Sequence, residues 1–391
     1  MGNKPRIRFK GFTEDWEQCK LGDLAEIVRG ASPRPISDPK WFDNDSNVGW
    51  LRIADVTAQD GRIRYLEQKI SELGQEKTRV IKTPHLLLSI AATVGKPVIN
   101  YVPTGVHDGF LIFLNPKFNI LYAFWWLEMF REKWNKYGQP GSQVNLNSDL
   151  VKNQVINIPN EKEQEKISSF LESLDKIITL HQCKLEKLKL TKKALLQKFF
   201  PKNGKRIPEI RFKGFTDAWE QRKVNDIFKI TRGQVLATSL TTSKKTSQNI
   251  YPVYSSQTKN NGLMGYYSEY LFENAITWTT DGANAGTVNF RPGRFYSTNV
   301  NGVLINENGY ACYAVSEIIN KVAYKYVSKV GNPKLMNNVM AEIDIMITAN
   351  IGELGRISKL IEAYNKLITL HQRKLERLQE VKKGLLQKMF V

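Results

Sequence analysis

Residues 178–200 read ITLHQCKLEKLKLTKKALLQKFF, and residues 368–390 read ITLHQRKLERLQEVKKGLLQKMF. The second stretch repeats the first at an offset of 190 residues without a gap. Apolar residues recur at alternating intervals of three and four, which places them on one narrow stripe of an α-helix. A lone helix would bury this stripe poorly. Two copies therefore predict two long helices that pack on each other like a coiled coil and hold two larger domains apart.

The stripe predicts the residues of the coiled-coil seam. They are Ile178, His181, Leu185, Leu188 and Leu195 in the first helix, and Ile368, His371, Leu375, Leu378 and Leu385 in the second. The two histidines occupy seam positions, which favours a satisfied or register-setting polar residue over a metal ligand or a catalyst.

A second duplication marks the start of each half. Residues 5–20 (PRIRFKGFTEDWEQCK) recur as residues 208–223 (PEIRFKGFTDAWEQRK) at an offset of 203. The chain is thus two tandem repeats, roughly 1–206 and 207–391, with similar ends and unlike middles. This pattern predicts one duplicated frame that presents two different recognition domains.

Bulk composition indicates a folded protein with a polyanionic partner. The chain has 391 residues, 41% of them hydrophobic, and a formal net charge of +19. Nucleic acid is the simplest partner, with an anionic membrane surface or an acidic protein as alternatives. Three distant cysteines imply no disulfide framework. No secretory signal or membrane-spanning segment is recognisable, so we expect a cytoplasmic protein.

We expect an α/β (α+β) fold with a pseudo-two-fold internal repeat. The expected domains are a first globular domain with its N-terminal tag (1–158), a first long helix (159–200), a basic linker with the repeated tag (201–215), a second globular domain (216–348) and a second long helix (349–391). Strands are predicted at Leu86–Ile90, Pro97–Tyr101 and Gly109–Leu114, and helices at Leu121–Tyr137 and Ala311–Lys329. The aromatic residues of Leu121–Tyr137 recur at helical spacing, which favours a core role over base stacking. The second globular domain should be rich in strands.

The two long helices differ at their starts. Asn160 and Glu163 fit a capping box, as do Asn350 and Glu353. Position by position, EKEQEKI (161–167) is replaced by IGELGRI (351–357), which puts two glycines into the second helix. Glycine costs about 1 kcal/mol relative to alanine inside a helix, so the second start is predicted to fray more.

Motifs for catalysis are missing from the sequence. We find no phosphate-binding loop, no Gly-rich turn suited to a dinucleotide or to S-adenosylmethionine, and no His, Cys or carboxylate spacing for a metal site. We therefore expect no bound cofactor and no enzyme activity in this chain.

Polar and basic loop residues are the remaining candidates for chemistry. Lysine and arginine neutralise phosphates, while arginine and amide side chains pair with base edges. In the first middle segment we predict DNA contacts from Arg34, Lys40, Arg52, Arg62, Arg64 and Lys96, and from Gln139, Ser142, Gln143 and Asn145 of loop 138–147. In the second we predict them from Arg232, Ser255, Ser256, Gln257, Lys259, Asn260, Thr279, Thr280, Asn284, Arg291, Arg294, Asn299 and, in loop 331–337, Lys334. Each residue alone is also compatible with an ordinary solvated loop, so the clusters are stronger candidates than their members.

Several motifs, most of them duplicated, resemble the specificity subunit of type I restriction-modification systems. They are FKGFT followed by WEQ in both tags, PNEKEQEKI at the start of the first helix, and ITLHQ, KLE and LLQK in both helices. The resemblance spans nearly the whole chain. It implies two target recognition domains that each read half of a bipartite, asymmetric DNA sequence, and antiparallel long helices that act as spacers.

The resemblance also implies that catalysis belongs to partner subunits. Methyltransferase subunits, two of them expected, would dock along the helices with S-adenosylmethionine and methylate adenine at N6. Restriction subunits would add ATP- and Mg-dependent translocation and cleavage. The departure at residues 351–357 predicts unequal docking of the two methyltransferase copies. A stand-alone DNA-binding or architectural protein and a scaffold for acidic proteins remain alternatives, and an enzyme in its own right is a further one.

Overall fold

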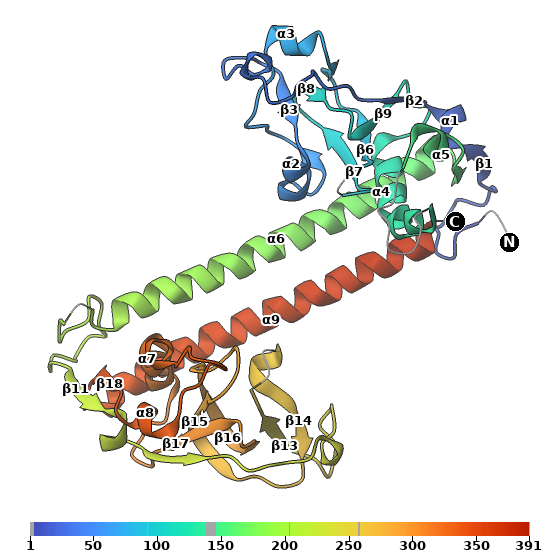
Figure 1. Cartoon of the computed structure of the whole chain (residues 1–391). Coiled ribbons are helices and arrows are strands. Elements are labelled where there is room, and N and C mark those ends of the chain that lie inside the picture. The colour runs from blue at the N-terminus through green and yellow to red at the C-terminus, as the bar shows by residue number, and fades with distance from the viewer. Residues whose placement is uncertain (1–3, 92, 138–145, 203, 257–258, 391) are drawn as a thin grey trace. The chain divides into compact units, whose positions relative to one another are not determined.

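The computed structural model describes residues 4–91, 93–137, 146–202, 204–256 and 259–390. The chain forms two compact units, each considered separately: unit 1 is Met1–Gln182 with Lys374–Val391, and unit 2 is Cys183–Arg373. Both predicted long helices are present, as α6 (Glu161–Phe199) and α9 (Ile351–Met389) (Figure 1). Each unit contains the start of one long helix and the end of the other, so the units differ from the two sequence repeats.

Unit 1 is a mixed α/β domain. Its five-stranded sheet has the order β2 (Glu26–Arg29), β9 (Phe110–Leu114), β6 (Leu86–Ser89), β7 (Pro97–Asn100) and β4 (Arg62–Ile63). A three-stranded sheet contains β3 (Gly49–Leu51), β8 (Thr104–Val106) and β5 (Arg79–Ile81). The short helices are α1 (Leu21–Leu24), α2 (Ile53–Ala58), α3 (Glu72–Gln75) and α5 (Ser148–Lys152). The strands predicted near residues 86, 97 and 109 are confirmed.

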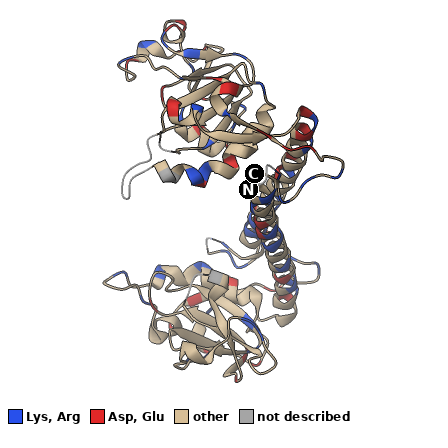
Figure 2. Ribbon diagram, turned by 90° about the vertical axis from the view of Figure 1, so that its right-hand side faces the viewer, with Lys and Arg blue, Asp and Glu red and all other residues tan. Residues whose placement is uncertain are grey.

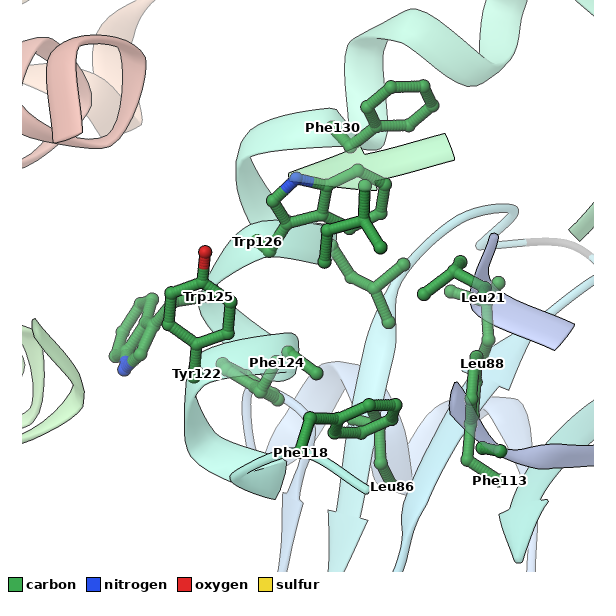
Figure 3. Close-up of a cluster of buried hydrophobic side chains, with 14 of the residues drawn as sticks. Leu21, Leu86, Leu88, Phe113, Phe118, Tyr122, Phe124, Trp125, Trp126 and Phe130 are labelled. Carbon is green, nitrogen blue, oxygen red and sulfur yellow. The ribbon is translucent and has the colours of Figure 1, made fainter. Parts of the chain in front are cut away.

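The predicted aromatic helix is the centre of the unit 1 core. It forms α4 (Ile120–Phe130), and a 3-10 helix (Arg131–Tyr137) continues it. Tyr122, Trp125 and Trp126 are at most 1% exposed. Figure 3 shows the aromatic side chains of α4 gathered beside Leu86, Leu88 and Phe113 of the sheet. The prediction that these rings belong to the core is confirmed, because none of the three is open for a base to stack on.

Unit 2 is dominated by a six-stranded sheet, as the predicted strand-rich domain requires. Its order is β12 (Lys229–Arg232), β17 (Asn301–Ile305), β15 (Phe272–Thr279), β16 (Val288–Ser297), β13 (Tyr251–Tyr254) and β14 (Leu263–Tyr267). Two helices accompany it, α7 (Tyr313–Ala323) and α8 (Asn337–Ala341). The helix predicted over Ala311–Lys329 is therefore shorter, because the chain tightens into a 3-10 turn at Tyr324–Tyr326.

Both globular parts are attached to the frame by equivalent two-stranded sheets. In unit 1, β1 (Glu17–Lys20) pairs antiparallel with β10 (Val155–Ile158), so that Lys20 lies opposite Val155. In unit 2, β11 (Glu220–Lys223) pairs in the same way with β18 (Asp344–Ile347), and Lys223 lies opposite Asp344. The segments between these strands, 21–154 and 224–343, are called head 1 and head 2 below. Each head leaves and rejoins the same frame at matching positions.

A buried carboxylate clamps the start of α6 to its tag. Both oxygens of Glu163 accept hydrogen bonds from Arg8, from Nε and from Nη2, at 2.7 Å each. Glu163 also accepts the indole N–H of Trp16 at 3.2 Å, and its own backbone N–H donates to Asn160 Oδ1 at 3.0 Å. The Glu163 carboxylate is fully buried and raises the pKa of Arg8. Asn160 thus caps the helix as predicted, while the Glu163 carboxylate binds the tag instead of completing the capping box.

The start of α9 is clamped in the same way, and its greater fraying stays a prediction. Glu353 accepts hydrogen bonds from Arg211 at 2.6 and 2.8 Å and from the Trp219 indole at 3.3 Å. Its backbone N–H donates to Asn350 Oδ1 at 3.3 Å. The helix is continuous from residue 351. The glycine argument considered helix propensity alone and missed this tertiary anchor.

In each unit, one long helix begins and the other ends, and the last residues of the ending helix complete the hydrophobic core of the unit. Met389 and Phe390 belong to the buried cluster of unit 1, which also contains Ile167 near the start of α6. In unit 2, Phe199 and Phe200 are buried in one cluster with Leu354, near the start of α9. The end of one helix thus meets the start of the other within each unit, so the two helices run antiparallel there. The tags reinforce this exchange, since Ile7 N–H donates to the Lys388 carbonyl and Ile210 N–H to the Lys198 carbonyl, both at 3.0 Å.

The predicted seam residues are less exposed than the residues around them on the helices. Ile178, Leu185 and Leu375 are buried. The remaining seven are partly buried: His181, Leu188, Leu195, Ile368, His371, Leu378 and Leu385. Among the described residues, none of the helices combines the length and apolar character needed to cross a membrane.

Candidate nucleic-acid interface

Both heads build an equivalent turn at the end of an edge strand. Strand β2 ends in Arg29-Gly30 and β12 ends in Arg232-Gly233. Gly30 N–H donates to the Phe110 carbonyl at 2.9 Å, and Gly233 N–H donates to the Asn301 carbonyl at 3.1 Å. A Cβ atom at either glycine would lie 2.2 Å from a backbone oxygen. Only glycine permits this close approach, which brings the arginine beside the turn before β9 or β17.

In head 1 this turn collects three exposed arginines around Asp108. The Asp108 carboxylate accepts hydrogen bonds from Ser32 Oγ and from Arg34 Nη2, both at 2.7 Å. The Asp108 carbonyl accepts Arg29 Nε at 2.6 Å, and Arg79 Nε donates to the Arg29 carbonyl at 2.8 Å. The Arg34 side chain is 73% exposed. The guanidinium groups are therefore held in fixed directions while keeping donors free for phosphate oxygens or a guanine edge.

The pKa values of two groups beside this turn are lowered. Burial alone would raise the pKa of Asp108, but the hydrogen bond from Ser32 and the charge of Arg34 lower it overall. His107 lies between the rings of Trp50 and Phe110, at centroid distances of 5.9 and 4.9 Å. Burial lowers the pKa of His107, and neighbouring Asp108 opposes this only in part. The site is thus an ionised carboxylate that orients cations, next to an uncharged imidazole.

In head 2 the equivalent region is rich in amide and hydroxyl groups. Thr298 Oγ1 donates to Ser255 Oγ at 3.0 Å, and Asn284 Nδ2 donates to the Ser256 carbonyl at 3.2 Å. Asn299 is exposed next to Thr298. The structure therefore brings together predicted contact residues from three distant segments, and exposed Arg232 flanks them at the end of β12.

The predicted loop 331–337 closes this region from another direction. Leu335 N–H donates to the Thr280 carbonyl at 2.8 Å, and Lys334 Nζ lies 3.9 Å from Asp281 Oδ1. Lys334 is exposed, whereas Thr279 and Thr280 are at most 7% exposed. The Thr280 hydroxyl donates within the turn, to Asp281 and to the Val300 carbonyl. The two threonines support the turn and have no surface to offer DNA.

Other predicted residues of head 1 lie outside the turn. Lys40 lies over the Trp41 ring and pairs with Asp38 at 2.9 Å. Arg52 pairs with Asp55 at 3.0 Å, and exposed Arg64 stacks on Tyr101.

Arg62 and Lys96 are engaged inside unit 1. Arg62 pairs with Glu172 of α6 and lies over the Phe124 ring. Lys96 lies between Asp60 and Glu128, at 2.6 and 2.5 Å. Both side chains are only 12% exposed and are already paired with carboxylates, so we correct the predicted DNA surface by leaving them out.

In head 2, Arg294 is half-exposed and pairs with Glu273 at 3.1 Å, on a different part of β15 and β16 from the turn. Asn260 is exposed in the β13–β14 turn, and Arg291 is buried. Gln139, Ser142, Gln143, Asn145 and Gln257 lie outside the described residues, as does the side chain of Lys259.

Arg29 and Arg79 were missed by the sequence analysis. A signal for Arg29 exists, because Arg29-Gly30 recurs as Arg232-Gly233 at the same offset of 203 that relates the two tags. Arg79 has no such partner, and only the packing of β5 places it here.

The chain carries two unlike heads on one duplicated helical frame, and each head has a polar turn at the same place. This arrangement defines a class of DNA specificity protein. The sequence matches the family described as "Type I restriction modification DNA specificity domain" over residues 13–190 and 216–380. The chain belongs to this family of type I restriction-modification specificity proteins.

Relatives of the chain carry matching descriptions. A putative type I specificity subunit of Mycoplasma pneumoniae is 30% identical over 227 residues, which cover 57% of this chain and 80% of the relative. The type I restriction enzyme MpnII specificity subunit of the same organism is 35% identical over 153 residues, which cover 38% of this chain and 44% of the relative. The crystal structure of the type I restriction-modification system S subunit from M. genitalium matches over 99% of both chains, with a TM-score of 0.71 at 13% identity. That structural likeness shows the shared fold.

Proposed function

We propose that this chain is the DNA-recognition subunit of a type I restriction-modification complex, and that each head reads one half of a bipartite, asymmetric target. The observation that supports this proposal most strongly is that both heads have a turn at the equivalent place, but with different side chains. Head 1 offers Arg29 and Arg34, which suit phosphates and guanine edges. Head 2 offers Asn284 and Asn299, which suit adenine edges. Like frames with unlike turns favour two different half-sites.

In this proposal the chain supplies recognition and no catalysis. Methyltransferase subunits would carry S-adenosylmethionine and flip the target adenine, and restriction subunits would carry ATP and Mg. The residues of this chain bind DNA, orient it and hold the partner subunits. We infer that the complex acts in the cytoplasm, where it meets chromosomal DNA.

An exposed apolar pair on each long helix suits the methyltransferase subunits. Ile177 and Leu180 are 45% and 67% exposed in unit 1. Their equivalents Leu367 and Leu370 are 44% and 63% exposed in unit 2. Large aliphatic side chains at such exposure favour burial by a partner. Matching pairs at an offset of 190 support two equivalent docking sites, while the different starts of α6 and α9 support unequal affinities.

Single substitutions that introduce a charge into the full chain test this docking. Ile177→Glu and Leu367→Glu should each remove one methyltransferase copy from the complex, because a carboxylate would be buried in an apolar contact. Mass measurement of the assembled complex would report a change from two copies to one. A complex that keeps two copies in both variants would contradict the proposed sites, and equal affinities in the wild type would contradict unequal docking.

Mapping of methylated adenines tests the proposed function. DNA from cells that express this chain with its methyltransferase subunit should carry one bipartite motif with a fixed spacer. Cells with the methyltransferase alone should lack it. Absent or random methylation would instead favour a stand-alone DNA-binding or scaffold protein.

A further inference from the structure

Each unit contains a cleft between its head and its stretches of the two long helices. The cleft of unit 1, here cleft 1, has a volume of about 800 Å³ and lies between residues 175–182, 379–387 and parts of head 1. The cleft of unit 2, here cleft 2, has a volume of about 1,120 Å³ and lies between residues 189–200, 362–373 and parts of head 2. Figure 2 shows basic residues recurring along the long helices, among acidic ones.

Eight pairs of residues in the helical walls of the two clefts correspond at an offset of 190. Identical pairs face both clefts: Ile178 and Ile368, Thr179 and Thr369, Lys382 and Lys192, Lys383 and Lys193, Leu386 and Leu196, and Gln387 and Gln197. Two further pairs differ in charge. Asp175 of cleft 1 is replaced by Asn365 in cleft 2, and Gln379 of cleft 1 is replaced by Lys189 in cleft 2. Both replacements make the wall of cleft 2 more positive.

Cleft 1 is electrostatically balanced. Lys382 pairs with Asp175 across the two helices and lies over the Trp125 ring. Asp60, Glu128 and Glu132 add three carboxylates from the head, and the first two pair with Lys96. A polyanion would find little surplus charge in this cleft.

Cleft 2 has a large surplus of cations. In addition to Arg291 from the head, it is lined by Lys189, Lys192, Lys193, Lys321, Lys366 and Arg373. The described residues lining it include two carboxylates, of Glu317 and Glu362. Each of these is already paired, Glu317 with Lys192 at 2.7 Å and Glu362 with Lys366 at 2.6 Å. Lys189 also pairs with Glu186, which lies outside the cleft wall, at 2.9 Å. For Lys193, Lys321, Arg291 and Arg373, the described residues that line the cleft provide no further carboxylate.

Among the cations that line cleft 2, Arg291 is the one best placed to bind an anion. It is 7% exposed, its Nε donates to Thr277 Oγ1 at 3.0 Å, and it lies 3.8 Å from the centroid of the Tyr254 ring. In the part of the chain that the structure describes, it forms no ion pair with a carboxylate. Burial lowers the pKa of Arg291 to about 10, and burial together with Lys202 and Lys325 lowers the pKa of Lys321. A bound anion would relieve both groups.

The rim of cleft 2 indicates which anion. Tyr254 lies at the end of β13, and Asn260 and Asn261 lie in the turn after it, where Asn260 is a predicted DNA contact. Asn289 and Phe290 line the cleft from β16. Amides pair with base edges and aromatic rings stack on bases. The volume also exceeds the needs of a single phosphate. An acidic protein segment would satisfy the lysines but would leave this rim without a role.

We propose that cleft 2 binds consecutive phosphates of one DNA strand and that cleft 1 does not, so that unit 2 adds a backbone contact that unit 1 lacks. This inference rests on the proposed function and refines it. Head 1 would hold the backbone through the arginines of its turn alone, whereas unit 2 would hold it through cleft 2 as well.

The test replaces the two charge-changing residues of cleft 2 with their counterparts from cleft 1. The double variant Lys189→Gln with Asn365→Asp introduces only residues that the equivalent wall already contains. Binding of fluorescent duplexes to the full chain in its methyltransferase complex is measured over a range of salt concentrations. The Kd should rise about tenfold for target and random duplexes alike, and the slope of log Kd against log salt should fall by about one unit for each lost phosphate contact. Arg291→Met should show the same pattern more strongly.

Lys187→Glu is the matched control, because it lowers the net charge by the same two units at an exposed position of the same helix that does not line the cleft. Its Kd should stay within about twofold of the wild type, with an unchanged salt slope. If the double variant behaves like this control, the inference is wrong. It is also wrong if the double variant binds DNA normally but loses its methyltransferase subunit, since cleft 2 would then hold an acidic protein segment. A wild-type complex that methylates no bipartite motif would instead overturn the proposed function itself.

Discussion

At the residue scale, one buried carboxylate in each unit connects the tag to the start of a long helix. Glu163 and Glu353 accept the same three hydrogen bonds from an arginine and a tryptophan of their tags. Glu163→Gln keeps the shape but removes the charge, so a nearly buried Arg8 would lose its main partner. We expect local stability to fall on the order of 2–3 kcal/mol, measured by amide hydrogen exchange across residues 161–167.

The equivalent substitution Glu353→Gln should weaken residues 351–357 by a similar amount, since its contacts are the same. Glu165→Gln, on the exposed side of the same turn of α6, is the control and should change stability by less than about 0.5 kcal/mol. Similar exchange in all three variants would show that the clamp contributes little.

His107 gives the recognition turn of head 1 a pH dependence. Its pKa is lowered in the folded protein, so the unfolded chain binds more protons than the folded chain as the pH falls below about 6.5. Stability from this group is therefore complete above about pH 6.5 and is lost as the pH falls towards the lowered pKa. Thermal unfolding followed between about pH 7 and about pH 5 should show a smaller loss in His107→Gln than in the wild type. Parallel curves would contradict this role.

At the element scale, α9 tolerates its glycines because tertiary contacts hold its start. A Cβ atom at Gly355 would meet no atom within 4 Å, whereas at Gly352 it would lie 3.1 Å from the capping oxygen of Asn350. Gly355→Ala should therefore stabilise the start of α9 by about 0.5–1 kcal/mol, and Gly352→Ala should gain less. Hydrogen exchange of residues 351–357 checks both predictions. A loss of protection in Gly355→Ala would contradict the claim that a Cβ atom fits at this position.

The elements themselves were largely predictable from periodicity. The 3-4 spacing predicted both long helices, and short apolar runs predicted β6, β7 and β9. The exchange of helix ends was not predictable, because Phe199 and Met389 look like ordinary helix termini until each is buried in a core built from other segments.

The candidate site was predicted less completely than the fold. Composition cannot distinguish a solvated arginine from a buried one, so Arg34 and Arg62 looked alike in the sequence although only Arg34 is exposed. Asn284 and Ser256 were both predicted, but only the fold brings these segments together. Arg29 could have been predicted from the sequence, because its Arg-Gly pair is duplicated.

At the scale of the whole molecule, the central claim is that each head specifies one half-site independently of the frame. The paired strand ends, Lys20 opposite Val155 and Lys223 opposite Asp344, define equivalent places to exchange the heads. Head 2 can therefore be replaced by a second copy of head 1 while both tags and both long helices are kept.

Mapping of methylated adenines for this head-duplicated chain tests the claim most directly. The wild type should give two unlike half-sites, and the head-duplicated chain should give the half-site of head 1 twice, as an inverted repeat around a spacer. An unchanged motif, or a new motif that lacks the half-site of head 1, would contradict the account.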